Sequence, residues 1–217
     1  MFRFLVLWSI TVIVGNCQIA SQENNVTIQV YYESQCGGCR DFFRTSLLYV
    51  YRELHDSFEI QTYPYGFAET IINSDGAVEF KCQHGPNECY GNMLHACAID
   101  ILGNFTKALD FNACMMEQGN PGKGSNDPSA EKCADLQNIK SQTIKDCAKS
   151  QKGADLVKRY GEKSNKITYE YIPYVIINGE VWNQESNPDF MVAVCGVYNI
   201  PPAPCVKYLA EINGGLK

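Results

Sequence analysis

Apolar and polar residues alternate along two short stretches near the start of the chain, and a helical pattern separates them. Residues 26–32 and residues 58–66 have apolar side chains at every second position, which is typical of half-buried strands. Over residues 39–55 apolar side chains recur at helical spacing, so we predict an amphipathic helix there. This part of the chain therefore predicts the order strand, helix, strand.

The middle of the chain has a helical pattern. We predict helices over residues 88–109 and 136–147, and a shorter one over residues 154–160. Residues 119–130 are rich in Gly, Asn, Pro and Ser, a composition that favours a loop. The middle therefore predicts a block of helices rather than a continuation of the sheet.

The last part of the chain returns to strands. Residues 171–183 indicate a short apolar strand, an Asn-Gly turn and a returning strand. Asn187 followed by Pro188 is typical of a helix start. The complete order resembles a thioredoxin-like α/β fold. We therefore predict one such domain over residues 18–217, with a disulfide-rich helical insertion at about residues 80–165 between its second and third strands.

Residues 1–17 have the features of a secretory signal peptide. Arg3 is followed by a largely apolar segment at residues 4–14, and the small residues Gly15 and Cys17 mark a cleavage site. The apolar segment is shorter than the about 20 residues that span a membrane, so an uncleaved anchor is the less favoured alternative. Cleavage leaves ten of the eleven cysteines, and an even number in the secretory pathway predicts disulfides.

Charge and hydropathy exclude two classes of partner. The formal charge of −6 and the isoelectric point near 5.1 argue against a nucleic-acid partner, because there is no basic stripe. After the signal peptide no segment is apolar enough for stable membrane insertion. Asn25 and Asn104 each begin an Asn-x-Ser/Thr sequon and are candidate glycosylation sites. We predict no cofactor and no bound metal.

Cys36 and Cys39 form a Cys-x-x-Cys pair where the first strand gives way to the first helix. Free N–H groups and the dipole at a helix N-terminus stabilise a thiolate, and such cysteines have pKa values lowered to roughly 3.5–7.5. The spacing of three lets the second thiol attack a mixed disulfide formed at the first. We therefore predict that Cys36 attacks the substrate and that Cys39 resolves the mixed disulfide.

Two other interpretations of this pair are weaker. A structural disulfide between the two cysteines would close a very short loop and would constrain the unfolded chain little. A zinc site could combine the pair with Cys82 and His84. An oxidising compartment with many other disulfides disfavours zinc, so redox chemistry is the favoured interpretation.

Pro173 precedes the predicted apolar strand. An X-Pro bond is cis in only about 5–6% of cases in folded proteins. Thioredoxin-like folds, however, place a cis-proline before this strand, facing the Cys-x-x-Cys pair. The resemblance therefore implies a cis bond between Ile172 and Pro173, where free backbone groups can dock an extended substrate segment.

Cys195 and Cys205 are predicted to form a structural disulfide. Cys195 lies near the end of the last predicted helix, and the nine-residue spacer contains Gly, Asn and three prolines, which end a helix and turn the chain. Such a turn allows the two Cα atoms to approach within the roughly 4.4–6.8 Å that a disulfide requires. The alternative partners of either cysteine are Cys114, Cys133 and Cys147.

Residues 82–97 read CQHGPNECYGNMLHAC. They match the signature C-Q-H-G-x2-E-C-x2-N-x4-C of the gamma-interferon-inducible lysosomal thiol reductase family, and the resemblance covers about residues 26–205. The fixed positions are Cys82, Gln83, His84, Gly85, Glu88, Cys89, Asn92 and Cys97. The resemblance implies reduction of protein disulfides at acid pH in endosomes and lysosomes. It also implies exposed or partly unfolded protein substrates and a small-molecule thiol as reductant.

The signature residues are expected to build the inserted helical block, with their cysteines in disulfides. A structural role is expected for His84 rather than a catalytic one, and His55 and His95 are expected to be ordinary helix residues. Twelve residues follow Cys205 and few precede the first strand after cleavage, so we expect no long removable segment. Secretion is therefore the main alternative to lysosomal delivery. A secreted binding protein on the same scaffold, or an oxidase or isomerase using the same pair, remains an alternative.

Overall fold

The computed structural model describes residues 26–119 and 124–214. The predicted signal peptide at residues 1–17 and the sequon at Asn25 lie outside the described residues. Within the described part of the chain, none of the helices combines the length and the apolar character that a membrane crossing requires.

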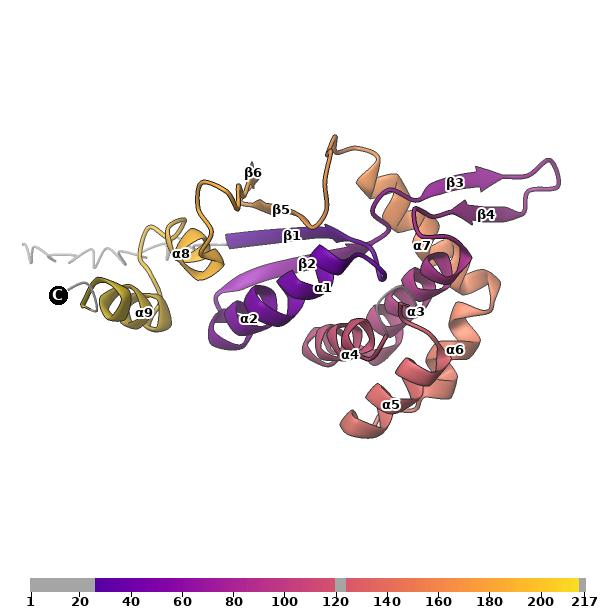
Figure 1. Ribbon diagram of the computed structural model, residues 1–217, viewed down its shortest axis with the longest axis horizontal. Helices are drawn as coiled ribbons and strands as arrows, with labels where there is room; N and C mark the ends of the chain where they lie inside the picture. Colours follow the sequence, from indigo (N-terminus) through magenta and orange to yellow (C-terminus); the bar gives the residue numbers. More distant parts are fainter. Residues whose placement is uncertain (1–25, 120–123, 215–217) are drawn as a thin grey trace, which may run out of the picture.

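A four-stranded mixed sheet with the strand order β2-β1-β5-β6 forms the centre of the molecule (Figure 1). Strand β1 (Val26–Tyr32) pairs in parallel with β2 (Phe58–Pro64) and antiparallel with β5 (Tyr174–Ile177). Strand β6 (Glu180–Val181) follows β5 through the predicted Asn-Gly turn. Parallel pairing of β1 and β2 requires a crossover connection, and the predicted helix over residues 39–55 supplies it.

The crossover consists of three helical segments that follow one another without a break: α1 (Gly37–Phe42), the π-helical turn η1 (Phe43–Leu47) and α2 (Leu48–Leu54). Their apolar side chains pack with the inward-facing residues of β1 and with the short helix α8 (Phe190–Cys195) in the main hydrophobic core. A smaller aromatic cluster packs on the opposite face of the sheet. Its buried members are Tyr31, Tyr63, Tyr174 and Ile176.

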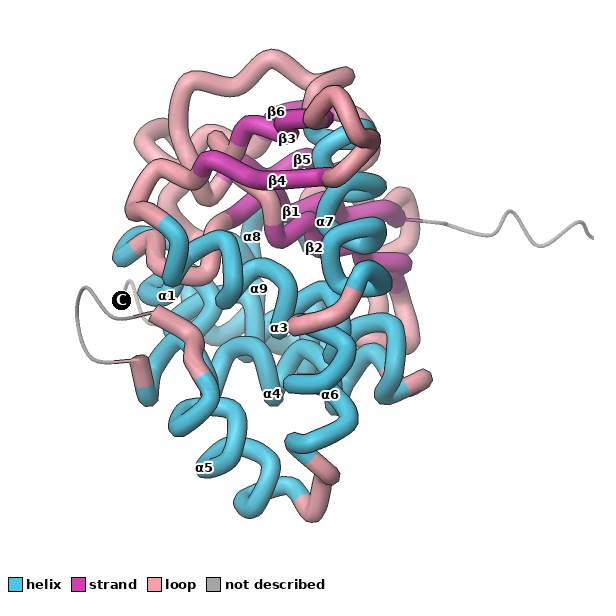
Figure 2. The backbone as a smooth tube through the Cα atoms, turned by 90° about the vertical axis from the view of Figure 1, so that its right-hand side faces the viewer, coloured by secondary structure: helices cyan, strands magenta, loops and turns pink. Residues whose placement is uncertain are grey.

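The chain between β2 and β5 forms an inserted block with its own core (Figure 2). A hairpin opens this block and five helices follow. The elements are β3 (Glu69–Ile72), β4 (Val78–Lys81), α3 (Pro86–Leu102), α4 (Phe105–Gln118), α5 (Asp127–Gln137), α6 (Ser141–Ala148) and α7 (Gln151–Ser164). Disulfides between Cys97 and Cys147 and between Cys114 and Cys133 tie α3 to α6 and α4 to α5.

Local caps change the predicted helix boundaries in this block. The single helix predicted over residues 88–109 is two helices, because Gly103 adopts a left-handed conformation with φ of 60° and ends α3. Asn104 then caps α4 by accepting a hydrogen bond from the Lys107 N–H at 3.0 Å. The loop predicted to extend to residue 130 ends earlier, because Asn126 and Ser129 form a capping box at the start of α5.

Two further differences lie outside the helical block or at its edge. Asp189, not Asn187, caps α8, and its carboxylate accepts a hydrogen bond from the Val192 N–H at 3.0 Å. The hairpin β3–β4 was not predicted. Its strands are short and largely exposed, so their sequence lacks the clear alternation that a buried face imposes.

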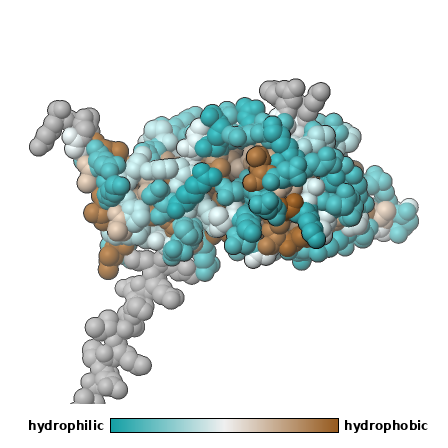
Figure 3. All heavy atoms as spheres, turned by 90° about the horizontal axis from the view of Figure 1, so that it is seen from below, coloured by the Kyte–Doolittle hydropathy of each residue, from teal (hydrophilic) through white to brown (hydrophobic). Residues whose placement is uncertain are grey.

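The C-terminal helix α9 (Ala203–Gly214) is joined to α8 by a disulfide between Cys195 and Cys205, whose Cα atoms are 5.4 Å apart. Cys205 is fully buried, whereas Val206 is 57% exposed and Ile212 is 38% exposed. Figure 3 shows apolar side chains gathered at the end of the molecule where α9 lies. Helix α9 therefore has one fully buried residue, its tethered cysteine, and packs on the main core through the partly buried Tyr208 and Leu209.

Candidate functional site

The Cys36–Cys39 pair lies between the end of β1 and the first turn of α1. Cys36 is the N-cap residue of α1, and its Sγ accepts a hydrogen bond from the Cys39 N–H at 3.0 Å. The two cysteines form a disulfide with Cα atoms 5.2 Å apart. Both cysteines are largely buried, but Cys36 retains 8% exposure whereas Cys39 has none, so Cys36 is the more accessible of the two.

Pro173 lies beside this pair. The Ile172–Pro173 bond is cis, and the carbonyl oxygen of Ile172 is 3.8 Å from Cys36 Sγ. A methyl group built on Gly38 would stand 3.6 Å from Pro173 Cδ, which places the proline ring against the first turn of α1. The backbone before β5 and the redox pair thus form one surface.

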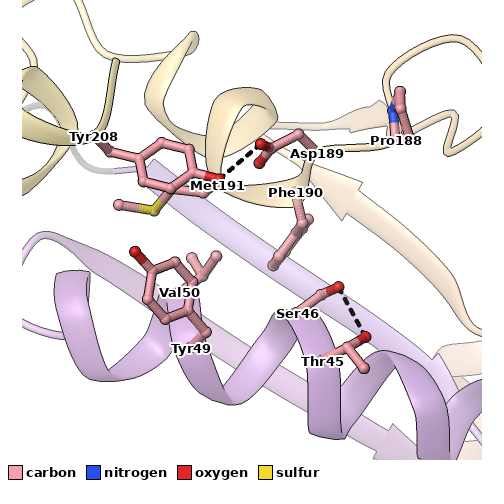
Figure 4. Close-up of a pocket in the computed structure, with 9 residues that line it drawn as sticks. All are labelled: Thr45, Ser46, Tyr49, Val50, Pro188, Asp189, Phe190, Met191 and Tyr208. Carbon is pink, nitrogen blue, oxygen red and sulfur yellow. Dashed lines mark hydrogen bonds between the residues drawn. The ribbon is translucent and has the colours of Figure 1, made fainter. Parts of the chain in front are cut away.

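Two adjoining hollows extend from this surface. The first, of about 330 Å³, lies next to the redox pair and is lined by Gly38, Asp41, Phe42, Thr45, Ser46, Tyr171, Ile172, Pro173, Trp182 and Gln184. The second, of about 360 Å³, shares Thr45 and Ser46 with the first. Figure 4 shows the second hollow, where Tyr49 and Tyr208 face each other across the gap and Tyr208 donates a hydrogen bond to Asp189. Together the hollows provide room for more than one residue of a substrate chain.

The redox loop, residues 33–36, is attached to α3 by residues of the signature. The Ser34 N–H donates a hydrogen bond to Asn92 Oδ1 at 2.9 Å. Ser34 Oγ donates to the Glu88 carbonyl oxygen at 3.1 Å. Helix α3 passes so close that a methyl group on Gly91 would lie 2.4 Å from Ser34 Oγ. The signature therefore holds the segment that presents Cys36, in addition to building the inserted block.

A second group of signature residues surrounds His84 at the start of α3. A disulfide joins Cys82, which precedes His84 in sequence, to Cys89, which follows Glu88. The zinc set of Cys36, Cys39, Cys82 and His84 is thereby excluded, because Cys82 already has Cys89 as its partner. Gly85 caps α3 with φ of 88°, and Gln83 is exposed in the same turn.

Glu33 joins His84 and Glu88 in a cluster that sequence reasoning missed. His84 Nδ1 lies 2.5 Å from Glu88 Oε2 and 3.5 Å from Glu33 Oε2. Glu33 Oε1 accepts a hydrogen bond from the Phe67 N–H at 2.6 Å. Burial, together with the nearby Glu88 carboxylate, raises the pKa of Glu33 to about 8. The ring nitrogen Nδ1 of His84 therefore faces two buried carboxyl groups.

His95 is not an ordinary helix residue, which corrects the prediction. Its ring is fully buried, with Nδ1 at 3.0 Å from the Tyr32 hydroxyl and Nε2 at 2.7 Å from Ser125 Oγ. Asn112 Nδ2 donates to the His95 carbonyl oxygen at 3.3 Å. Burial lowers the pKa of His95 to about 3, so the imidazole stays neutral while the protein is folded.

We expect His95 to make the protein less stable as the pH falls. The unfolded chain binds a proton at this residue below about pH 6.5, whereas the folded chain does so only near pH 3. Between pH 7.5 and 4.5 this difference should remove ~2–3 kcal/mol from the free energy of unfolding. Urea unfolding at both pH values should therefore show a smaller loss for His95→Gln than for wild type.

The exposed His55 supplies the control for this measurement. His55→Gln should lose stability with pH as the wild type does, since the His55 side chain is 47% exposed. Because His95→Gln removes buried hydrogen bonds, an NMR titration of the wild-type imidazole serves as a second readout. A His95 ring that becomes protonated near pH 6.5 in the folded protein would contradict the prediction.

The chain matches known proteins in sequence and in fold. A family model described as "Gamma interferon inducible lysosomal thiol reductase (GILT)" matches residues 27–137. A gamma-interferon-inducible lysosomal thiol reductase-like protein of Anopheles gambiae is 33% identical over 201 residues, which cover 85% of this chain and 81% of the relative. The gamma-interferon-inducible lysosomal thiol reductase of Carassius auratus is 32% identical, over 86% of this chain and 74% of the relative.

Among solved structures, reduced DsbA from Mycobacterium tuberculosis is similar with a TM-score of 0.59 and 15% identity. The match covers 86% of this chain and 88% of that chain, and it confirms the predicted thioredoxin-like fold. The family model spans half of the sequence, including the redox pair and the complete signature. The chain therefore belongs to the gamma-interferon-inducible lysosomal thiol reductase family and is a thiol–disulfide oxidoreductase.

Proposed function

We propose that this enzyme reduces disulfide bonds of protein substrates, with Cys36 as the attacking thiol and Cys39 as the resolving thiol. The observation that carries the proposal is the position of Cys36 as N-cap of α1, where it keeps 8% exposure, while Cys39 in the first turn has none. A thiolate at this position gains from the free N–H groups of the first turn, and the Cys39 N–H already points at the Cys36 sulfur at 3.0 Å.

The chemistry proceeds by two thiol–disulfide exchanges. The Cys36 thiolate attacks one sulfur of the substrate disulfide, which forms a mixed disulfide and releases the other substrate sulfur as a thiolate. The Cys39 thiolate then attacks Cys36 Sγ, which releases the second substrate sulfur and closes the Cys36–Cys39 disulfide. Two electrons pass to the substrate in total. Two molecules of a small thiol return these electrons by reducing the enzyme disulfide, and they leave as the disulfide of that thiol.

The surface beside the redox pair favours an extended or unfolded substrate segment. The Ile172 carbonyl oxygen, 3.8 Å from Cys36 Sγ, is positioned to accept a hydrogen bond from a substrate backbone N–H. The two hollows that adjoin at Thr45 and Ser46 offer places for substrate side chains on one side of the reacting sulfur. A compact folded substrate would have to open locally to reach both features.

We propose an acidic compartment of the endosomal and lysosomal route, or the extracellular space, as the setting. The support comes from the family, since both relatives described above have lysosomal thiol reductase in their names. A thiol reductase in such a compartment needs a thiolate at a pH far below the ordinary thiol pKa of about 8.5. The helix N-terminus at Cys36 is a feature that lowers a thiol pKa.

Insulin reduction tests this function. The wild-type enzyme, supplied with a small thiol such as cysteine, should reduce insulin faster than the thiol alone at pH 4.5 and at pH 7. An oxidase would instead form disulfides in a reduced, unfolded protein faster than it breaks them in insulin. A binding protein without turnover would accelerate neither reaction. Either of these results would contradict the proposal.

A further inference from the structure

The Glu33–His84–Glu88 cluster has a buried carboxyl oxygen without a hydrogen-bond partner at its centre. Glu33 and Glu88 are fully buried, yet Glu33 Oε2 has no hydrogen-bond partner. This atom points toward His84, whose Nδ1 is 3.5 Å away. A buried polar atom without a hydrogen-bond partner lowers the stability of the folded protein. A bound group that contacts Glu33 Oε2 would remove this cost.

We propose that Glu33, His84 and Glu88 bind one divalent cation of the zinc class. One nitrogen and two carboxylate oxygens form a ligand set that zinc accepts, with a water molecule completing four-coordination. The ligand atoms of these three residues lie within 4.8 Å of one another. This inference does not depend on the direction in which the Cys36–Cys39 pair works.

The distances between the three ligand atoms are close to those around a zinc ion, so binding would need only a small shift of the side chains. Two ligands of a tetrahedral zinc ion, each at about 2.0–2.1 Å from the metal, stand roughly 3.3 Å apart. The 3.5 Å between His84 Nδ1 and Glu33 Oε2 is close to this value. The 2.5 Å between His84 Nδ1 and Glu88 Oε2 must lengthen, so coordination would replace that hydrogen bond.

The charged residues around the cluster do not already neutralise its two carboxyl groups. Within the described residues, neither Glu33 nor Glu88 forms an ion pair with a lysine or an arginine, and the basic side chain near both carboxyl groups is the imidazole of His84. The His84 side chain is 43% exposed, which provides a path from solvent to two otherwise buried carboxyl groups. The Cys82–Cys89 disulfide fixes the turn that presents His84.

A cation here would join two parts of the fold that are far apart in sequence. Glu33 directly follows β1 and lies three residues before Cys36, whereas Glu88 lies in the first turn of α3. The ion would thus add a bond between the redox loop and the inserted block, beside the hydrogen bonds from Ser34 to Asn92 and to Glu88. Zinc should therefore stabilise the folded protein.

Isothermal titration of tag-free, oxidised protein with zinc chloride at pH 7 tests the site. The ten described cysteines are all in disulfides in this form, so free thiols do not compete for the metal. We expect one zinc ion per chain for wild type. His84→Gln and Glu33→Gln should weaken binding at least about tenfold, since losing even an outer hydrogen-bond partner of a ligand costs about 10–100-fold.

His84→Gln is the decisive variant, because the side chain is 43% exposed and outside the hydrophobic cores, and the glutamine amide can still donate a hydrogen bond to Glu88. Its matched control is His55→Gln, which removes an exposed histidine next to Asp56. Zinc should raise the melting temperature of wild type and His55→Gln but not of His84→Gln. Unchanged zinc affinity in His84→Gln, or no binding by wild type, would overturn the proposal and leave the cluster as a set of structural hydrogen bonds.

Discussion

Replacing Cys36 with serine should reduce the rate of insulin reduction to that of the small thiol alone, a loss of several orders of magnitude. Replacing Cys39 should give a different defect, because Cys36, the more accessible of the two cysteines, can still attack while no resolving thiol remains to release the substrate. Mixed disulfides between Cys36 and substrate should then accumulate. Non-reducing gels and mass spectrometry of the trapped adduct measure this.

The disulfide at Cys114 and Cys133 provides a matched control for this experiment. The two cysteines join α4 to α5 in the inserted block and line neither of the two hollows beside the redox pair. Changing both to alanine should leave the turnover of the folded enzyme near that of wild type. Full activity of Cys36→Ser, or adducts attached to Cys39 in that variant, would show that the roles of the two redox cysteines are wrongly assigned.

Removing the Cys97–Cys147 disulfide should have the largest effect on stability. This bond joins residues 50 positions apart in sequence, and chain entropy alone predicts a loss of ~4 kcal/mol when such a link is removed. Both cysteines are buried in the core of the inserted block, so changing them to alanine also loses packing there. Denaturant unfolding of the Cys97→Ala/Cys147→Ala variant should show a cooperative transition at much lower denaturant concentration.

The Cys195–Cys205 bond should behave differently. Its sequence separation of 10 predicts about 2.7 kcal/mol at most, and the helix that it tethers is buried only at Cys205. Hydrogen exchange should therefore become faster in α9 while the sheet and α3 stay protected. Equal losses of global stability in the two double variants would contradict the argument from loop length and core position.

The redox chemistry could be predicted from sequence because its determinants are local. Cys36 and Cys39 are three positions apart, and the alternation before them and the helical spacing after them place both at a strand-to-helix junction. The C-terminal disulfide could be predicted for the same reason, since a nine-residue spacer with Gly and Pro can turn the chain back on itself. Periodicity, turn composition and spacing therefore determined the order of the strands and helices along the chain, the crossover helix and the position of the pair.

The surroundings of the pair were decided only by the tertiary structure. Glu33 and His84 are 51 positions apart, and Tyr32 and His95 are 63 apart, so no local pattern connects them. Their contacts arise because packing of the inserted block brings the start of α3 against the end of β1, where Asn92 receives the Ser34 N–H. The sequence alone singled out the Cys36–Cys39 pair as the candidate for the thiol chemistry. Folding decided which buried groups surround the pair, because burial and charge pairing depend on neighbours that only the packed chain supplies.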